Sequence, residues 1–126
     1  MNKQIINTTD APAPIGPYSQ AVKAGSLLFI SGQIALKPGT AELITGNIKE
    51  ETEMVMQNLQ AILETAGLGF ANVIKTTIFL KEMASFAPVN EVYGKFFESD
   101  FPARETVAVK ELPKDVNVEI SMIASE

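Results

Sequence analysis

The sequence predicts one α+β domain in which two helices cover one face of a mixed six-stranded sheet. Three observations lead to this prediction. Two segments carry apolar residues at helical spacing, and β-branched segments alternate with them in the order strand, hairpin, helix, strand, helix, strand, strand. The chain has 126 residues without a repeat or a linker-like change of composition, so we expect residues 1–126 to form a single domain.

The first elements are a short strand, a loop and a hairpin. Residues 3–6 (KQII) suit an edge strand, and the loop that follows, APAPIGPYS, contains prolines that remove backbone donors and block a helix. The segment SQAVKAGSLLFISGQI then holds two strand-like runs around Ala24, Gly25 and Ser26, which suit a hairpin turn. The turn-rich segment LKPGTAELITG leads to the first helix.

The first helix is predicted within residues 47–67, NIKEETEMVMQNLQAILETAG. Asn47 can cap its first turn, with Glu50 three positions later in a capping-box arrangement, and Gly67 suits the left-handed stop. The apolar stripe of this helix repeats at spacings of three, four or seven and comprises Ile48, Val55, Leu59, Ile62 and Ala66.

The second half of the chain is predicted as strand, helix, strand, strand. The run VIKTTIFLK is rich in β-branched residues, and a helix is expected at roughly 85–99, before Pro102. The apolar face of that helix comprises Phe86, Val89, Tyr93, Phe96 and Phe97. Strands at about 104–110 and 116–124 are joined by ELPKD. If they pair as an antiparallel hairpin, Arg104 lies near one end and Glu119 a few residues along the partner strand.

The last strand, VNVEISMIA, alternates between apolar and polar side chains. This alternation predicts a polar face of Asn117, Glu119 and Ser121 opposite an apolar face under the helices, composed of Val116, Val118, Ile120 and Met122. In LLFIS and VIKTTIFL, however, both alternating sets contain apolar or β-branched residues. We therefore expect the second face of the sheet to be covered by other copies of the chain.

The composition excludes several kinds of chemistry. The chain has no cysteine and no histidine, so thiolate nucleophiles, disulfides and the commonest general base and metal ligand are all absent. Fifteen acidic and ten basic residues give a net charge of −5, which disfavours a nucleic-acid partner. No signal-like core or apolar run of about 20 residues is present, which predicts a cytoplasmic protein without a membrane partner.

Arg104 and Glu119 are the strongest candidates for chemistry. A guanidinium can hold a carboxylate with two parallel hydrogen bonds, although Arg104 could instead cap the preceding helix at the surface. Glu119 could position or deprotonate a water molecule, although a strand glutamate usually lies on a solvated face. Together they would form a small hydrolytic site that needs no metal, histidine or thiol.

Four further residues are weaker candidates. Tyr18 offers a ring and a hydroxyl group, which suits either a site or an interface. Ser31 and Gly32 interrupt an apolar strand, which indicates a bulge or the close approach of a ligand. Asn90, on the second predicted helix, could bond a neighbouring loop or a substrate.

The chain resembles the RidA family, also called the YjgF/YER057c/UK114 family, over nearly its full length. The resemblance lies in the segments IGPYSQA, ISGQI, NVIKTTIFL, FAPVNEVYGKFF, FPAR and LPKDVNVEI. It implies a chorismate-mutase-like α+β fold and a homotrimer with three sites between subunits. It also implies hydrolysis of 2-iminobutanoate and 2-iminopropanoate, released by pyridoxal-phosphate-dependent dehydratases, to 2-oxo acids and ammonia. No cofactor or metal is implied.

The resemblance assigns a role to each candidate. Arg104 matches the arginine that binds the substrate carboxylate, and Glu119 matches the acid that places the attacking water. The expected substrate-binding residues are Tyr18, the Ser31–Gly32 backbone wall, Asn90, Arg104 and Thr106.

One position departs from the pattern of the family. Thr106 stands where many bacterial members have cysteine, so thiol-based regulation cannot operate here. Two rival functions remain open. One is a non-catalytic regulatory trimer that binds small carboxylates. The other is a ribonuclease or translation inhibitor, which the acidic composition and missing histidine disfavour.

Overall fold

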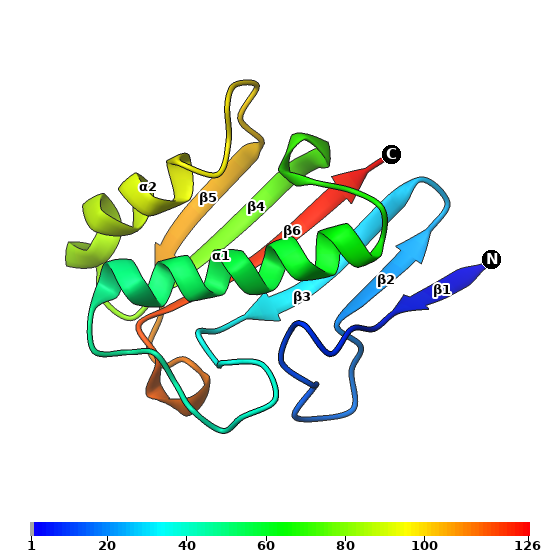
Figure 1. Ribbon diagram of the computed structural model, residues 1–126. Helices are drawn as coiled ribbons and strands as arrows, with labels where there is room; N and C mark the ends of the chain where they lie inside the picture. The colour runs from blue at the N-terminus through cyan, green and yellow to red at the C-terminus, as the bar shows by residue number, and fades with distance from the viewer. Residues whose placement is uncertain (1) are drawn as a thin grey trace.

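A computed structural model describes residues 2–126 as one six-stranded sheet with two helices. Figure 1 shows the chain from the N-terminal strand to the C-terminal one. The strands and helices, in chain order, are β1 (Lys3–Ile6), β2 (Ala21–Ala24), β3 (Leu27–Gln33), α1 (Ile48–Thr65), β4 (Val73–Leu80), α2 (Phe86–Gly94), β5 (Ala103–Ala108) and β6 (Val118–Ser125). Short 3-10 turns cover Phe70–Asn72, Met83–Ser85 and Pro113–Asp115. The predicted order of elements is confirmed.

Helix α1 has the boundaries that its capping residues predict. The side chain of Asn47 accepts hydrogen bonds from the backbone N–H groups of Lys49 and Glu50, at 2.9 and 3.1 Å. Gly67 ends the helix with a φ of 77°, a conformation that favours glycine. The stripe residues Val55, Leu59 and Ile62 are fully buried against the sheet.

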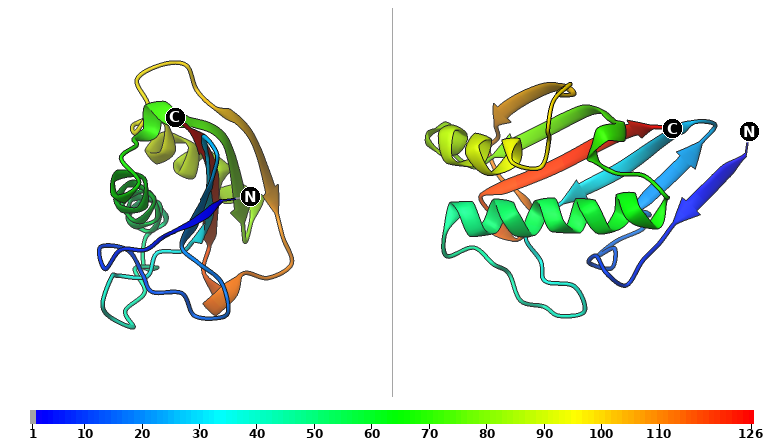
Figure 2. Two further views of the ribbon diagram at one scale, coloured as in Figure 1. Left: turned by 90° about the vertical axis from the view of Figure 1, so that its right-hand side faces the viewer. Right: turned by 45° about the horizontal axis from the view of Figure 1, so that its top comes forward.

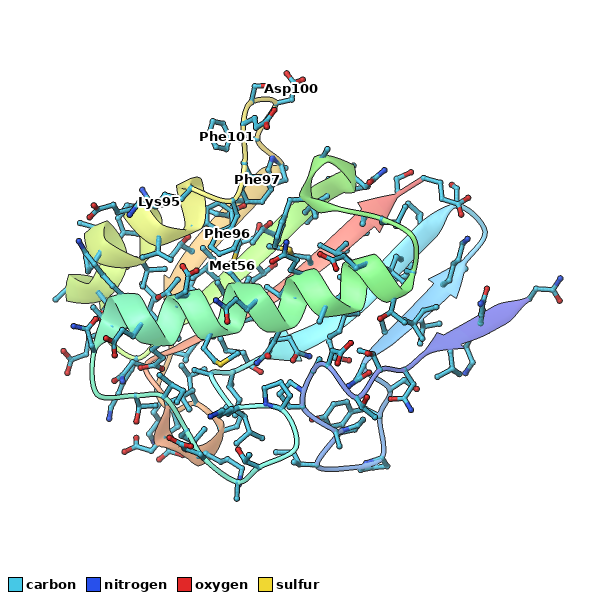
Figure 3. All side chains as sticks on the ribbon, in the orientation of Figure 1. Met56, Lys95, Phe96, Phe97, Asp100 and Phe101 are labelled. Carbon is cyan, nitrogen blue, oxygen red and sulfur yellow. The ribbon has the colours of Figure 1, made fainter. Side chains whose placement is uncertain are left out.

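Helix α2 is shorter than predicted. It ends at Gly94, whereas the apolar spacing predicted a helix to about residue 99. The N–H groups of Lys95, Phe96 and Phe97 bond carbonyls three residues earlier, so the chain leaves the helix through tight turns. Phe97, labelled in Figure 3, is still buried, because its ring packs on Tyr93 at a centroid distance of 4.8 Å.

The predicted hairpin of the last two strands is wrong. The strand order is β1-β2-β3-β6-β4-β5, so β6 lies between β3 and β4 and does not pair with β5. Strand β5 instead pairs parallel to β4, as expected for two strands connected through a helix, here α2. The central place of β6 fits its buried apolar residues, whereas β5 is an exposed edge strand.

Both helices lie on the same face of the sheet, as the sequence predicts. The edge-on view in Figure 2 shows α1 and α2 together on one side. The apolar residues predicted for that face of the last strand are all buried: Val118, Ile120 and Met122 in the main core, and Val116 in a second, smaller cluster with Ile34 and Leu36. Leu28, Ile78 and Leu80 complete this core from β3 and β4.

The other face of the sheet carries exposed apolar side chains. Phe29 is 44% exposed and Val107 is 41% exposed, and each points away from the helices because its neighbours on the strand point toward them. Ile5 on β1 is also half exposed. This partly apolar open face agrees with the sequence. Within residues 2–126, neither helix is long and apolar enough to cross a membrane.

Candidate functional site

Arg104 lies on the helix-covered face of β5, in a cleft that we call the arginine cleft. Its guanidinium Nη1 donates a hydrogen bond to Asn90 Oδ1 of α2 at 2.6 Å. The cleft has a volume of about 360 Å³ and is lined by Asn90, Tyr93, Gly94, Phe101, Pro102 and Arg104. Because Asn90 occupies only one edge of the guanidinium, other N–H groups remain available to a carboxylate.

Two aromatic rings support Arg104. Its Cζ atom lies 5.1 Å from the centre of the Tyr93 ring and 5.7 Å from that of Phe86. From the sequence, both rings are predicted only as part of the apolar face of a helix. The sequence does contain a signal for their place beside Asn90, because Phe86, Asn90 and Tyr93 follow the i, i+4, i+7 spacing of one helix face. These contacts stabilise the cation in one orientation.

Glu119 lies on the open face of β6, beside a bulge in β3. Ile30 pairs with Met122 and Gln33 pairs with Ile120, so Ser31 and Gly32 together oppose one residue of β6. The predicted bulge is therefore confirmed. A Cβ atom at Gly32 would lie 2.4 Å from Glu119 Oε2, so glycine is the residue that leaves room for this carboxylate.

The Glu119 side chain borders a small cavity of about 50 Å³ that we call the glutamate cavity. Tyr18, Gly32 and Gln33 also line it, together with the Pro12–Ile15 loop. The sequence analysis missed Gln20, whose amide bonds Thr8, Ala11 and Pro12 and so shapes that loop. Ser31 is close by, but its hydroxyl group donates to the Ser19 carbonyl at 2.6 Å, a bond that anchors the loop.

Partial burial in this cavity changes the acidity of Glu119. Removing water from around the carboxylate disfavours the charged form and raises the pKa of Glu119 above its ordinary range. The group can therefore hold a proton at a higher pH than a surface glutamate does. This behaviour suits a residue that must both donate and accept a proton.

Arg104 and Glu119 do not meet within one chain. Their strands are separated by β4, and the register places Arg104 beside Thr76 and Glu119 beside Phe79. Two strand spacings and three residues along the sheet separate their backbones by about 14 Å. Their side chains also point to opposite faces, so a small acid bound to Arg104 cannot reach Glu119 of the same copy.

Thr106 lies two residues after Arg104 on the same face of β5. Its hydroxyl group is buried, and no hydrogen-bond partner for it exists among residues 2–126. An unpaired buried hydroxyl group is unfavourable unless something binds it. Thr106 therefore offers a polar contact beside the guanidinium.

The comparisons with known proteins assign the chain to a family. The family model described as Endoribonuclease L-PSP matches residues 8–126. The chain belongs to this family. Solved structures similar to the chain include the YjgF protein of E. coli and RidA of an Antarctic Psychrobacter, each 42% identical, with TM-scores of 0.92 and 0.94, so the resemblance to the RidA family is confirmed.

Individual members of the Endoribonuclease L-PSP family resemble the chain along its whole length. A RutC family protein of Pyrococcus horikoshii is 53% identical over 97% of both chains. A 2-iminobutanoate/2-iminopropanoate deaminase of Dermatophagoides farinae is 46% identical over 96% of this chain and 94% of its own. E. coli TdcF with bound serine superposes with a TM-score of 0.93 at 41% identity, covering 98% of each chain.

The raised pKa of Glu119 predicts how Glu119→Gln changes stability with pH. Because the fold disfavours the charged carboxylate, the wild type loses stability as pH rises through the raised pKa. Glu119→Gln is therefore expected to raise the melting temperature at pH 7. At about pH 3.5, where both side chains are neutral, the two proteins should melt alike. Thermal unfolding at both pH values checks this, and an equal gain at both would contradict it.

Proposed function

We propose that the chain is a hydrolytic deaminase that converts 2-iminobutanoate and 2-iminopropanoate to 2-oxo acids and ammonia. The proposed sites lie between the subunits of a homotrimer. The observation that carries the proposal is the division of the candidate site, with a carboxylate clamp on one face of the sheet and a partly buried glutamate on the other. The printed name of the deaminase relative from Dermatophagoides farinae supports the choice of substrate.

A closed ring of subunits would complete each site. If the arginine cleft of one copy faces the glutamate cavity of the next, every copy contributes one half to each of two sites. Such an assembly would also bury exposed apolar side chains of the open face, among them Phe29 and Val107. Both features support a second copy as the partner of this chain.

The proposed chemistry needs one water molecule and no cofactor. Arg104 holds the carboxylate of the imino acid and so fixes the position of C2. Protonated Glu119 gives its proton to the imine nitrogen, and the resulting carboxylate accepts a proton from the water that attacks C2. The C2–O bond forms as the C=N double bond becomes a single bond. The same proton then moves to the amine. As the C2–N bond breaks and ammonia leaves, the Glu119 carboxylate accepts the proton of the C2 hydroxyl group, so the C=O group forms and Glu119 is protonated again.

Thr106 and Asn90 have supporting roles in this proposal. Asn90 Oδ1 holds one edge of the guanidinium, which leaves the other edge for the substrate. The unpaired hydroxyl group of Thr106 can donate to a substrate oxygen beside it. A hydroxyl group serves this purpose without a thiol.

A coupled assay tests the proposed function. Threonine and a threonine dehydratase generate the imine, and semicarbazide traps whatever is not hydrolysed. The wild type should divert imine from the semicarbazone to 2-oxobutanoate in proportion to its concentration. A rate equal to that of the protein-free blank, with correctly folded protein, would refute the proposal.

The bound serine in E. coli TdcF favours one alternative, a trimer that binds small carboxylates without turnover. Glu119→Gln separates the two functions. A deaminase should lose turnover in this variant while it still binds 2-oxobutanoate through Arg104. A purely binding protein has no turnover to lose, and calorimetry with 2-oxobutanoate would detect its ligand in both proteins.

Gly32→Ala is expected to fold but to hydrolyse the imine poorly. The new methyl group would occupy the position of the Glu119 carboxylate, which must rotate away. We expect turnover to fall about a hundredfold because the proton donor is displaced, with a stability loss below about 2 kcal/mol. Gly46→Ala is a matched control, since nothing lies within 4 Å of a Cβ atom there and Gly46 lies outside both the arginine cleft and the glutamate cavity. Equal turnover in both variants would contradict this role of Gly32.

A further inference from the structure

Glu51 is a fully buried carboxylate in the first turn of α1. Its partners all belong to the start of β6. Oε2 accepts from the backbone N–H groups of Asn117 and Val118, at 2.8 and 3.2 Å, and Oε1 accepts from Asn117 Nδ2 at 2.7 Å. Three donors thus converge on one side chain, which the proposed chemistry does not use.

Burying a charged carboxylate without an opposite charge costs free energy, so the burial of Glu51 needs a physical explanation. One part of the explanation is local, because negative charge is stabilised at the N-terminus of an 18-residue helix. The other part is the segment that the three hydrogen bonds hold in place. They attach the helix to the two residues that directly precede Glu119, and the Asn117 carbonyl is held in turn by the Lys81 N–H at 2.9 Å.

We infer that Glu51 is a positioning residue that holds Glu119 in the proposed site. The inference rests on the proposed function for its kinetic consequences only. Glu119 is confined on one side by the bulge at Gly32 and along its own strand by the bonds from Glu51 to Asn117 and Val118. With the strand end released, the bulge at Gly32 and the pairing with Phe79 of β4 are the constraints that stay on Glu119. Glu51 never touches the substrate and acts only through this backbone.

The chain offers a matched control at the other end of the same strand. Asn72 Nδ2 donates to the Ser125 carbonyl at 3.1 Å, and its Oδ1 accepts from the Gly69 N–H at 3.0 Å. Asn72 therefore ties the far end of β6 as Glu51 ties the near end. Only the near end adjoins Glu119.

Three variants test the inference. Glu51→Leu removes all three bonds. Glu51→Gln keeps an oxygen for both backbone N–H groups, while its amide can donate to a reoriented Asn117 side chain. Asn72→Ala removes the tie at the far end. We expect Glu51→Leu to lower kcat at least about thirtyfold, with the affinity for 2-oxobutanoate changed less than about twofold.

The conservative variant and the control separate positioning from stability. Glu51→Gln should keep kcat within about threefold of the wild type, and Asn72→Ala should lose stability without losing kcat. A kcat in Glu51→Leu equal to that of Asn72→Ala would overturn the inference. If Glu51→Leu does not fold, Asn117→Ala removes only the bond to Oε1. It should lower kcat several-fold, and an unchanged kcat would overturn the inference.

An NMR titration of Glu119 tests the inference without any turnover, and so also when the wild type is inactive and the proposed function fails. The Glu119 carboxyl signal in ¹³C-labelled protein, assigned by its loss in Glu119→Gln, reports the pKa of this group. Released from the cavity in Glu51→Leu or Asn117→Ala, Glu119 should show a pKa nearer the ordinary range, whereas Asn72→Ala should match the wild type. A Glu119 titration that is unchanged in the near-end variants would overturn the inference independently of any enzyme assay.

Discussion

Arg104→Ala is expected to lower kcat/KM for 2-iminobutanoate hydrolysis by about a thousandfold, because two charge-assisted hydrogen bonds of about 2 kcal/mol each are lost. The loss should be seen in kcat as well as in KM, since a substrate that is not held at its carboxylate is not aimed at the water. The coupled assay with semicarbazide measures both constants.

Arg104→Lys tests whether a positive charge alone is enough at this position. Lysine keeps the charge but has no planar fork to match a carboxylate or to lie against the Tyr93 and Phe86 rings. We expect kcat/KM of Arg104→Lys to be at most about tenfold higher than that of Arg104→Ala. Lys110→Ala, which removes an exposed cation shortly after β5, is the control and should behave as the wild type. Full activity in Arg104→Ala would refute its role as the carboxylate clamp.

Mixing two inactive variants is expected to restore activity. Arg104→Ala leaves the glutamate cavity intact, and Glu119→Gln leaves the arginine cleft intact. In a mixed trimer, a site works when the first variant supplies its glutamate and the second supplies its arginine. Random mixing at equal amounts makes this true of about one site in four, so activity should rise from near zero to about 25% of the wild type.

The experiment requires subunit exchange, which co-expression of the two variants under separate affinity tags provides. The control is a single chain that carries both substitutions, co-expressed with Glu119→Gln. In that pair every arginine-competent copy lacks the glutamate and every other copy lacks both, so no site can work. Activity no higher in the mixture of single variants than in this control would refute a site shared between subunits.

Much of the fold follows from local patterns, as α1 illustrates. A polar cap at Asn47, the apolar stripe and Gly67 all act within a few residues, so the sequence alone defines both ends of the helix. The same applies to the hairpin at Gly25, which has the positive φ, 62°, expected of a turn glycine. Helix α2 can end early because aromatic contacts, which need no helix, bury Phe97 and partly bury Phe96.

The position of β6 could not be predicted in this way. Alternation shows which face a residue takes but not which strand lies beside it. Consecutive strands often pair, and that tendency favoured the hairpin that proved wrong. The motif residues stay candidates for the site, and the two half-sites emerged only when the strand order placed Arg104 and Glu119 on separate strands with β4 between them.

The strand order also bears on how the protein is synthesised. The β1-β2-β3 ribbon and the β4-β5 pair are held in one sheet only through β6, which follows both of them in the sequence. A nascent chain on the ribosome therefore has two sheet fragments with open edges until β6 emerges. Open edges of this kind favour association with other strands, so the emergence of β6 is the step at which the sheet closes and this risk of aggregation ends.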